Sequence, residues 1–246
     1  MKKIIEINNL SRDFQVGEET VHALRNVSFS IEEGEFVTIM GTSGSGKSTL
    51  LNILGCLDTP TQGEYLLDEA SVAKMSKDDR AEYRNRKIGF IFQSYNLLSR
   101  TTALDNVALP LLYNGHISKN ERIHRAKEAL INVGLENRMM HFSNQMSGGQ
   151  QQRVAIARAL VNNPVIILAD EATGNLDTRT SFEILSLFQD LHKQGKTIIF
   201  VTHNPELSQY SSRTILLRDG RIISDTKNEN PLSAAKTLSE LPKTDL

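Results

Sequence analysis

Apolar residues in the first third of the chain recur in short, partly alternating segments that Gly17 and Gly34 interrupt. A period of two is typical of strands that bury one face. The pattern therefore predicts a small β region at the N-terminus. Its apolar positions are Ile5, Ile7, Val21, Leu24, Val27, Phe29 and Ile31.

A compact apolar run at Phe36–Met40 ends abruptly at Gly41. A helical pattern begins at Lys47 and continues through Leu50, Leu51, Ile53 and Leu54. A run of five apolar and β-branched residues favours a buried strand, whereas a spacing of three and four favours a helix. This segment is therefore predicted to be a strand, a glycine loop and a helix.

Residues 74–160 are richer in helix formers, and positions 121–133 have the apolar spacing of one amphipathic helix. Two buried strands are predicted beyond them, at Val165–Ala169 and Thr197–Val201, with a helix at Ser181–Leu191 between them. Strands that alternate with helices indicate a parallel sheet. We expect an α/β fold with a helical insertion.

The last predicted strands, Thr214–Leu217 and Arg221–Ile223, flank Asp219 and Gly220, a dipeptide that suits a tight hairpin turn. From Lys227 onward the chain is polar and contains two prolines. We expect a loose tail or a short docking helix there.

Composition narrows the class of protein. With 39% hydrophobic and 23% charged residues, the chain can form a packed core. The net charge of −1 makes nucleic acid a poor partner. The single cysteine, Cys56, has no disulfide partner, and no export signal or apolar run of roughly 20 residues is visible, so we expect a cytoplasmic location.

The glycine loop carries the first chemical motif, a glycine, four residues, and then glycine, lysine and serine. Such a loop lets successive N–H groups converge on a phosphate at the start of a helix. Lys47 is expected to reach the β and γ phosphates, and Ser48 to bind Mg²⁺. This motif alone does not distinguish between GTPases, kinases and several classes of ATPase. The predicted nucleotide-binding residues here are Gly41, Thr42, Ser43, Gly44, Ser45, Gly46, Lys47, Ser48 and Thr49.

Two carboxylates follow the predicted strand that ends at Ala169. Ligands gather at the carboxyl ends of parallel strands. Asp170 is therefore expected to hold Mg²⁺, and Glu171 to orient and deprotonate the attacking water. The alternative is a solvated acidic strand end.

A third motif, Ser147, Gly148, Gly149 and Gln150, opens an apolar helix. Serine is a good N-cap, and glycine allows an anion to approach the backbone. This run resembles the signature motif of the ATP-binding cassette family. The resemblance implies an ATPase that uses ATP and Mg²⁺, and a homodimer in which each signature closes on the ATP of the other copy.

The resemblance assigns roles to four more residues. Gln93 resembles the glutamine of the loop that touches Mg²⁺, and His203 the histidine that contacts the γ-phosphate and completes the catalytic set with Lys47 and Glu171. Asp177 resembles the aspartate of the D-loop, although it could also be an N-cap. Phe14 resembles the aromatic residue that stacks on adenine, although it could also be a core residue of the β region.

Three positions depart from the family pattern. Phe14 replaces a commoner Tyr, Met146 a commoner Leu, and Ala172 the usual Pro. None of them removes a catalytic group.

The resemblance also implies domain boundaries. Residues 1–225 are expected to form one cassette domain, with a P-loop core, an N-terminal antiparallel β subdomain and a helical subdomain at about 94–160, followed by a tail at 226–246. Segments 54–65 and 92–98 further resemble the macrolide-exporter and lipoprotein-release subfamily. We therefore expect a subunit that powers a membrane permease at the cytoplasmic face of the inner membrane.

The sequence leaves the role of one apolar set and the choice between several functions open. An apolar set beside Gln93 could bind a permease helix or belong to the core: Tyr95, Leu97, Leu98, Leu109, Leu111 and Leu112. A cassette ATPase of DNA repair or translation, and a module that senses ATP without hydrolysis, are the alternative functions. The remaining histidines, 22, 116, 124, 141 and 192, are expected to be structural, and the basic group at positions 80, 84, 86 and 87 a solvated helix face.

Overall fold

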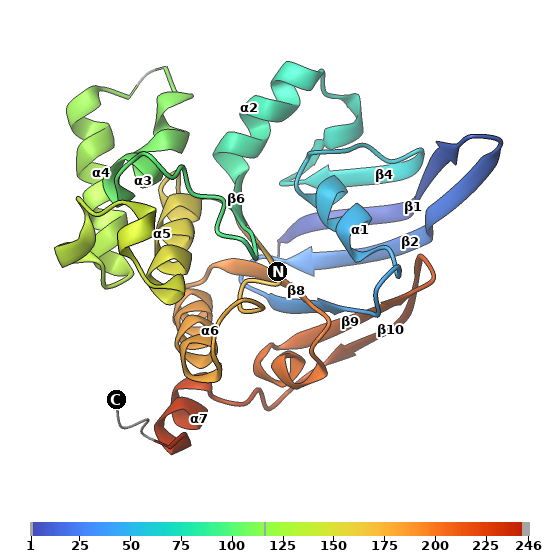
Figure 1. Ribbon diagram of the computed structural model, residues 1–246. Helices are drawn as coiled ribbons and strands as arrows, with labels where there is room; N and C mark the ends of the chain where they lie inside the picture. The colour runs from blue at the N-terminus through green and yellow to red at the C-terminus, as the bar shows by residue number, and fades with distance from the viewer. Residues whose placement is uncertain (1, 116, 243–246) are drawn as a thin grey trace.

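The computed structural model describes residues 2–115 and 117–242. Figure 1 shows two sheets beside a group of helices. The strands are β1 (Lys3–Val16), β2 (Glu19–Glu32), β3 (Phe36–Met40), β4 (Gln62–Leu67), β5 (Ala70–Ser71), β6 (Ile88–Ile91), β7 (Ile166–Asp170), β8 (Thr197–Thr202), β9 (Arg213–Arg218) and β10 (Arg221–Lys227). The helices are α1 (Lys47–Leu54), α2 (Lys77–Lys87), α3 (Ala103–Leu112), α4 (Lys119–Asn132), α5 (Gly148–Leu160), α6 (Thr178–Lys193) and α7 (Ala234–Glu240).

The central sheet has the strand order β10-β9-β3-β8-β7-β6. Its strands run parallel except for β10, which pairs antiparallel with β9. All six residues of β8 are buried, as are the first four of β7, because helices or the other sheet cover both faces. The predicted parallel sheet is confirmed, and its sequence signal was the continuous apolar character of these strands.

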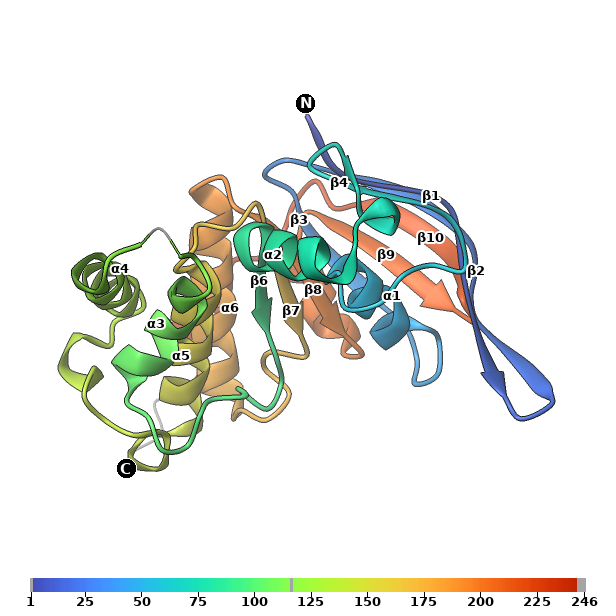
Figure 2. The same ribbon diagram turned by 90° about the horizontal axis from the view of Figure 1, so that it is seen from above.

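The antiparallel sheet has the order β2-β1-β4-β5. Its inner face packs with α1 and one face of the central sheet in a single apolar cluster. Ile5, Ile7 and Ile31 are among the fully buried members, in agreement with the predicted alternation. Figure 2 shows α1 lying beside this sheet, so the helix that follows the glycine loop is enclosed between the sheets.

Helices α3, α4 and α5 pack together at the left of Figure 1. With α6 they cover the other face of the central sheet in a second apolar cluster. The amphipathic helix predicted at 121–133 is α4, which begins after the N-cap Ser118. Helix α2 carries the basic group, which is not wholly solvated, because Arg84 donates to the carbonyl of Cys56 and Lys87 pairs with Asp68.

The C-terminal segment forms α7, which lies against α6 (Figure 1). The Gln189 side chain on α6 donates to the carbonyl of Leu232 at 2.7 Å and accepts from the amide of Ala234 at 2.9 Å. Of the two expectations for this segment, the docking helix is the one observed over residues 234–240. The tail positions 243–246 and the first residue of the expected domain lie outside the described residues.

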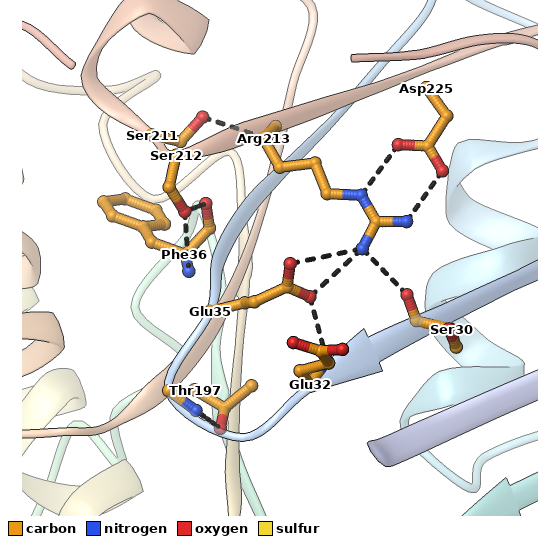
Figure 3. Close-up of polar contacts among 10 residues, drawn as sticks. Ser30, Glu32, Glu35, Phe36, Thr197, Ser211, Ser212, Arg213 and Asp225 are labelled. Carbon is orange, nitrogen blue, oxygen red and sulfur yellow. Dashed lines mark hydrogen bonds and ion pairs between the residues drawn. The ribbon is translucent and has the colours of Figure 1, made fainter. Parts of the chain in front are cut away.

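Arg213 on β9 joins the two sheets (Figure 3). Its guanidinium donates two hydrogen bonds of 2.7 Å to Asp225 on β10, and further bonds to Glu35 and to the carbonyl of Ser30 on β2. The hydrogen bonds to Asp225 raise the pKa of Arg213 above its ordinary value. This network fixes the antiparallel sheet relative to the strands that carry the site. No helix in the described part of the chain has the length and apolar character needed to cross a membrane.

Candidate nucleotide site

The glycine loop lies between β3 and α1, and its lysine is held at the centre. The Lys47 ammonium donates to the carbonyls of Gly41 at 2.7 Å and Thr42 at 2.8 Å. Partial burial lowers the pKa of Lys47, against the opposing effect of the nearby carboxylates Glu171 and Asp170. The loop therefore presents a cation and the free N–H groups of a helix N-terminus to the same space.

Glycine is required at Gly46 for two reasons. Its φ is +101°, and a Cβ there would lie 2.6 Å from the carbonyl oxygen of Ala23 on β2. The hairpin turn between β9 and β10 supports the loop from another side, because Gly220 donates to the carbonyl of Ser45 at 3.0 Å. Sequence reasoning identified Asp219 and Gly220 only as a turn, and no local signal showed what they support.

The two predicted carboxylates lie at the end of β7. Burial, followed by the charge of Glu171, raises the pKa of Asp170, and Lys47 partly offsets this. Glu171 adopts a left-handed backbone with φ +44°, and its amide donates to the carbonyl of Val201 at 2.9 Å. A glutamate in this region stores strain, which the neighbouring strand maintains.

His203 follows β8, the neighbouring strand. Its Nδ1 lies 2.6 Å from Oε1 of Glu171. The histidine side chain is 65% exposed and the glutamate side chain 23% exposed, so the pair faces the open side of the sheet edge.

A cleft of about 1120 Å³ unites most of the predicted nucleotide residues. Gly41 and Ser45 do not line it. Sequence reasoning missed Val21, His22 and Arg25, which also line the cleft, and the expectation that His22 is merely structural overlooked its place on the wall. The predicted residues that line it are Thr42, Ser43, Gly44, Gly46, Lys47, Ser48, Thr49, Asp170, Glu171 and His203.

The signature residues line a different pocket, of about 720 Å³. Ser147 caps α5 by accepting from the amide of Gln150, whose side chain accepts in turn from the amide of Ser147. Ser147, Gly149 and Gln150 border this pocket, and none of the described glycine-loop residues does. A Cβ on Gly148 would lie 2.7 Å from the hydroxyl of Tyr95, so the glycine lets the signature helix meet the loop after Gln93.

Gln93 turns toward the D-loop segment. Its side-chain amide donates to Oδ1 of Asn175 at 3.3 Å, and the Asn175 amide donates to the carbonyl of Gln93 at 3.2 Å. Gln93 does not line the nucleotide cleft. Asp177 caps α6 by accepting from the amide of Thr180 at 2.9 Å, and its hydrogen bonds with Thr180 lower its pKa.

Phe14 lies on β1 and is 37% exposed, which argues against the core alternative, although it is not among the residues that line the cleft. Met146 and Ala172, two of the departures from the family pattern, are buried. No cluster of three or more metal-ligating side chains occurs within the described residues, and His116 lies outside them.

Comparisons with known proteins agree with this geometry. Residues 24–174 match the family described as ABC transporter. An uncharacterized ABC transporter ATP-binding protein of Thermotoga maritima is 58% identical over 90% of this chain and 94% of its own length. The macrolide export ATP-binding/permease protein MacB of Chlorobium luteolum is 50% identical over 92% of this chain, which spans only 34% of that protein.

Solved structures extend the agreement to the fold. The dimeric structure of MJ0796, a bacterial ABC transporter cassette, aligns with a TM-score of 0.84 and 48% identity over 92% of this chain and 99% of that one. A second dimeric structure of MJ0796, in a post-hydrolysis state with ADP and Pi bound, also aligns with a TM-score of 0.84, at 47% identity and the same coverage. The chain therefore belongs to the ABC transporter family, among its ATP-binding proteins.

Proposed function

We propose that this chain binds and hydrolyses ATP to power a membrane transporter, and that it works as a head-to-tail homodimer beside a permease at the cytoplasmic face of the inner membrane. The observation that carries the proposal is the single cleft formed by Lys47, Asp170, Glu171 and His203. A cation for phosphates and a base for water occupy the same space, as in-line attack on a γ-phosphate requires.

The donor set of the cleft fits Mg²⁺. Among the described residues the Asp170 carboxylate has no hydrogen-bond or ion-pair partner, and the Ser48 hydroxyl lines the same space. Carboxylate and hydroxyl oxygens are ligands that this hard cation prefers. Mg²⁺ would neutralise charge on the phosphate oxygens when bound. Gln93 would join Asp170 and Ser48 through its Oε1 only after moving toward the cleft, which it does not line.

Glu171 is the proposed general base. A base must reach the proton it abstracts, and the strained backbone of Glu171 points its carboxylate into the cleft beside His203. His203 orients this carboxylate and contacts the terminal phosphate. Lys47 balances the charge that develops on that phosphate.

The separate signature pocket supports the dimer. Ser147 and Gly149 border this pocket at the N-terminus of α5, where free N–H groups suit an anion, but the glycine loop of the same chain does not reach it. A second copy can bring its nucleotide there. The dimer of the related cassette MJ0796 supports this arrangement. Because closure of this dimer depends on the γ-phosphate, ATP favours the closed dimer and ADP favours the open state.

A groove of about 770 Å³ between α2, α3 and α5 is the proposed permease contact. Leu57, Phe92, Leu109 and Tyr113 give it apolar walls suited to a helix. Of the set predicted from sequence, only Leu109 lines this groove, and Leu111 is fully buried in the core.

The test is a Glu171→Gln variant. We expect it to bind ATP, to accumulate as a dimer in analytical ultracentrifugation, and to release phosphate roughly 10²-fold or more slowly than the natural protein. Glu229→Gln, on an exposed residue after β10, is the matched control and should hydrolyse normally. Normal turnover by Glu171→Gln would show that another group is the base.

A further inference from the structure

Arg12 on β1 contacts two side chains outside the chemistry described above. Its Cζ lies 4.5 Å from the centroid of the Phe14 ring, and its Nε lies 2.9 Å from Oδ2 of Asp58. The two charged side chains are 23% and 27% exposed. The contact with Asp58 is an ion pair in which Nε makes no hydrogen bond, so charge attraction and the ring contact together keep the guanidinium over Phe14.

Asp58 belongs to the loop that leaves α1. The amides of Leu57 and Asp58 both donate to the carbonyl of Asn52 in α1, so the loop is tied to the end of this helix. The phosphate-binding Lys47 begins the same helix. The Arg12–Asp58 pair therefore links the phosphate-binding helix to the strand that bears Phe14.

The same loop also binds the backbone of β1. Thr61 donates from its amide to the carbonyl of Ser11 at 2.8 Å, and its hydroxyl accepts from the amide of Asp13 at 3.0 Å. Register shifts interrupt the pairing of β1 with β2 on both sides of Arg12. The hydrogen bonds from Thr61 therefore fix the backbone of β1 at the point where its pairing with β2 is irregular.

Phe14 lies next to the nucleotide cleft. It pairs in register with Val21, which lines the cleft, and its ring remains 37% exposed. The Arg12 guanidinium covers one face of the ring. A planar base can stack on the other face.

We infer that Arg12 and Asp58 are positioning residues, which hold the Phe14 ring for the nucleoside end of the nucleotide while α1 holds its phosphates. The inference rests on the proposed function, since it needs a nucleotide in this cleft. Arg12 does not line the nucleotide cleft and acts through Phe14. The pair thus fixes the separation between the base-stacking ring and the phosphate loop.

Steady-state hydrolysis by Arg12→Ala and Asp58→Asn tests this inference. We expect the KM for ATP to rise about three- to tenfold, because one ordered aromatic contact with the nucleotide is lost. The kcat should stay within about twofold of that of the natural protein. Inorganic tripolyphosphate has no base, so its competitive inhibition constant should not change. Arg12→Lys, which keeps the cation but loses the planar stack, should give an intermediate KM.

The controls separate positioning from general stability. Lys3→Ala removes another paired cation from β1, exposed and away from Phe14, and should leave the KM for ATP unchanged. In a protein that already carries Phe14→Ala, adding Arg12→Ala should not raise the KM for ATP further. The inference would be overturned if Arg12→Ala weakened the binding of ATP and of tripolyphosphate equally. It would also be overturned if Arg12→Ala raised the KM for ATP as much without Phe14 as with it. Failure of the natural protein to hydrolyse ATP would instead overturn the proposed function.

Discussion

The Nδ1 atom of His203 lies 2.6 Å from Oε1 of Glu171, although 32 positions separate the two residues in the chain. The register of two parallel strands brings them together, because Asp170 at the end of β7 pairs with Val201 near the end of β8. Each residue follows its strand onto the same sheet edge. Backbone pairing therefore places the proposed base, Glu171, close to His203, and their side chains can form the hydrogen bond without any change in the strands.

Replacing His203 by alanine should impair hydrolysis more than binding. The Glu171 carboxylate loses its partner, and we expect phosphate release to fall roughly 10²-fold while ATP affinity changes little. Phosphate release and equilibrium nucleotide binding measure the two effects. His124→Ala, on an exposed histidine of α4, is the control. An equal loss of both properties would contradict a role in the chemical step.

Asp170→Asn should stabilise the nucleotide-free protein at neutral pH while preventing hydrolysis. Burial raises the pKa of Asp170, so its contribution to stability is present at low pH and is lost as pH rises through the folded-state pKa. The variant removes the buried charge. Its melting temperature should exceed that of the natural protein at pH 7, and the difference should shrink as pH falls through the raised pKa and be lost below about pH 4. A difference independent of pH would contradict this origin.

Gly89→Ala should destabilise the fold without touching the site. A Cβ at this position in β6 would lie 2.5 Å from the backbone carbonyl of Ala159, which would force the strand away from α5. We expect the free energy of unfolding to fall by about 1–3 kcal/mol, as measured in urea. Gly115→Ala is the matched control, because no atom of the described residues, apart from its chain neighbours, lies within 4 Å of its added Cβ. Equal stability of the two variants would refute the close approach.

Cys56 should be unreactive in the folded protein. Its side chain is fully buried, and burial raises the pKa of the thiol to about 12. Thiolate is the reactive form, so an aromatic disulfide reagent at pH 8 should label the native protein only slowly and the urea-unfolded protein fully. Rapid labelling of the native protein would show that the segment after α1 opens readily.

Much of the fold was predictable because its signals are local. Strands β7 and β8 are buried on both faces and are therefore apolar at nearly every position. The glycine loop, the carboxylates at 170 and 171 and the signature are contiguous runs, and each needs its residue types for reasons of backbone conformation or charge. The helical and antiparallel parts followed from periodicity and from the family resemblance.

Contacts between distant segments were not predictable. Nothing near Gly46 in the sequence shows that it packs against Ala23, and nothing near Gly220 shows that it supports Ser45. Gln93 was assigned from resemblance alone, and its pairing with Asn175 depends on how two loops meet.

The sequence by itself determined which residues carry charge, hydroxyl groups and conformational freedom, and the segments in which strands and helices form. Only the tertiary structure decided that Glu171 meets His203, that Ser147 lines a pocket apart from Lys47, and that Arg12 stacks on Phe14. The physical reason is that local preference arises from neighbours along the chain. Proximity between segments arises from strand register and from apolar faces that must be buried together.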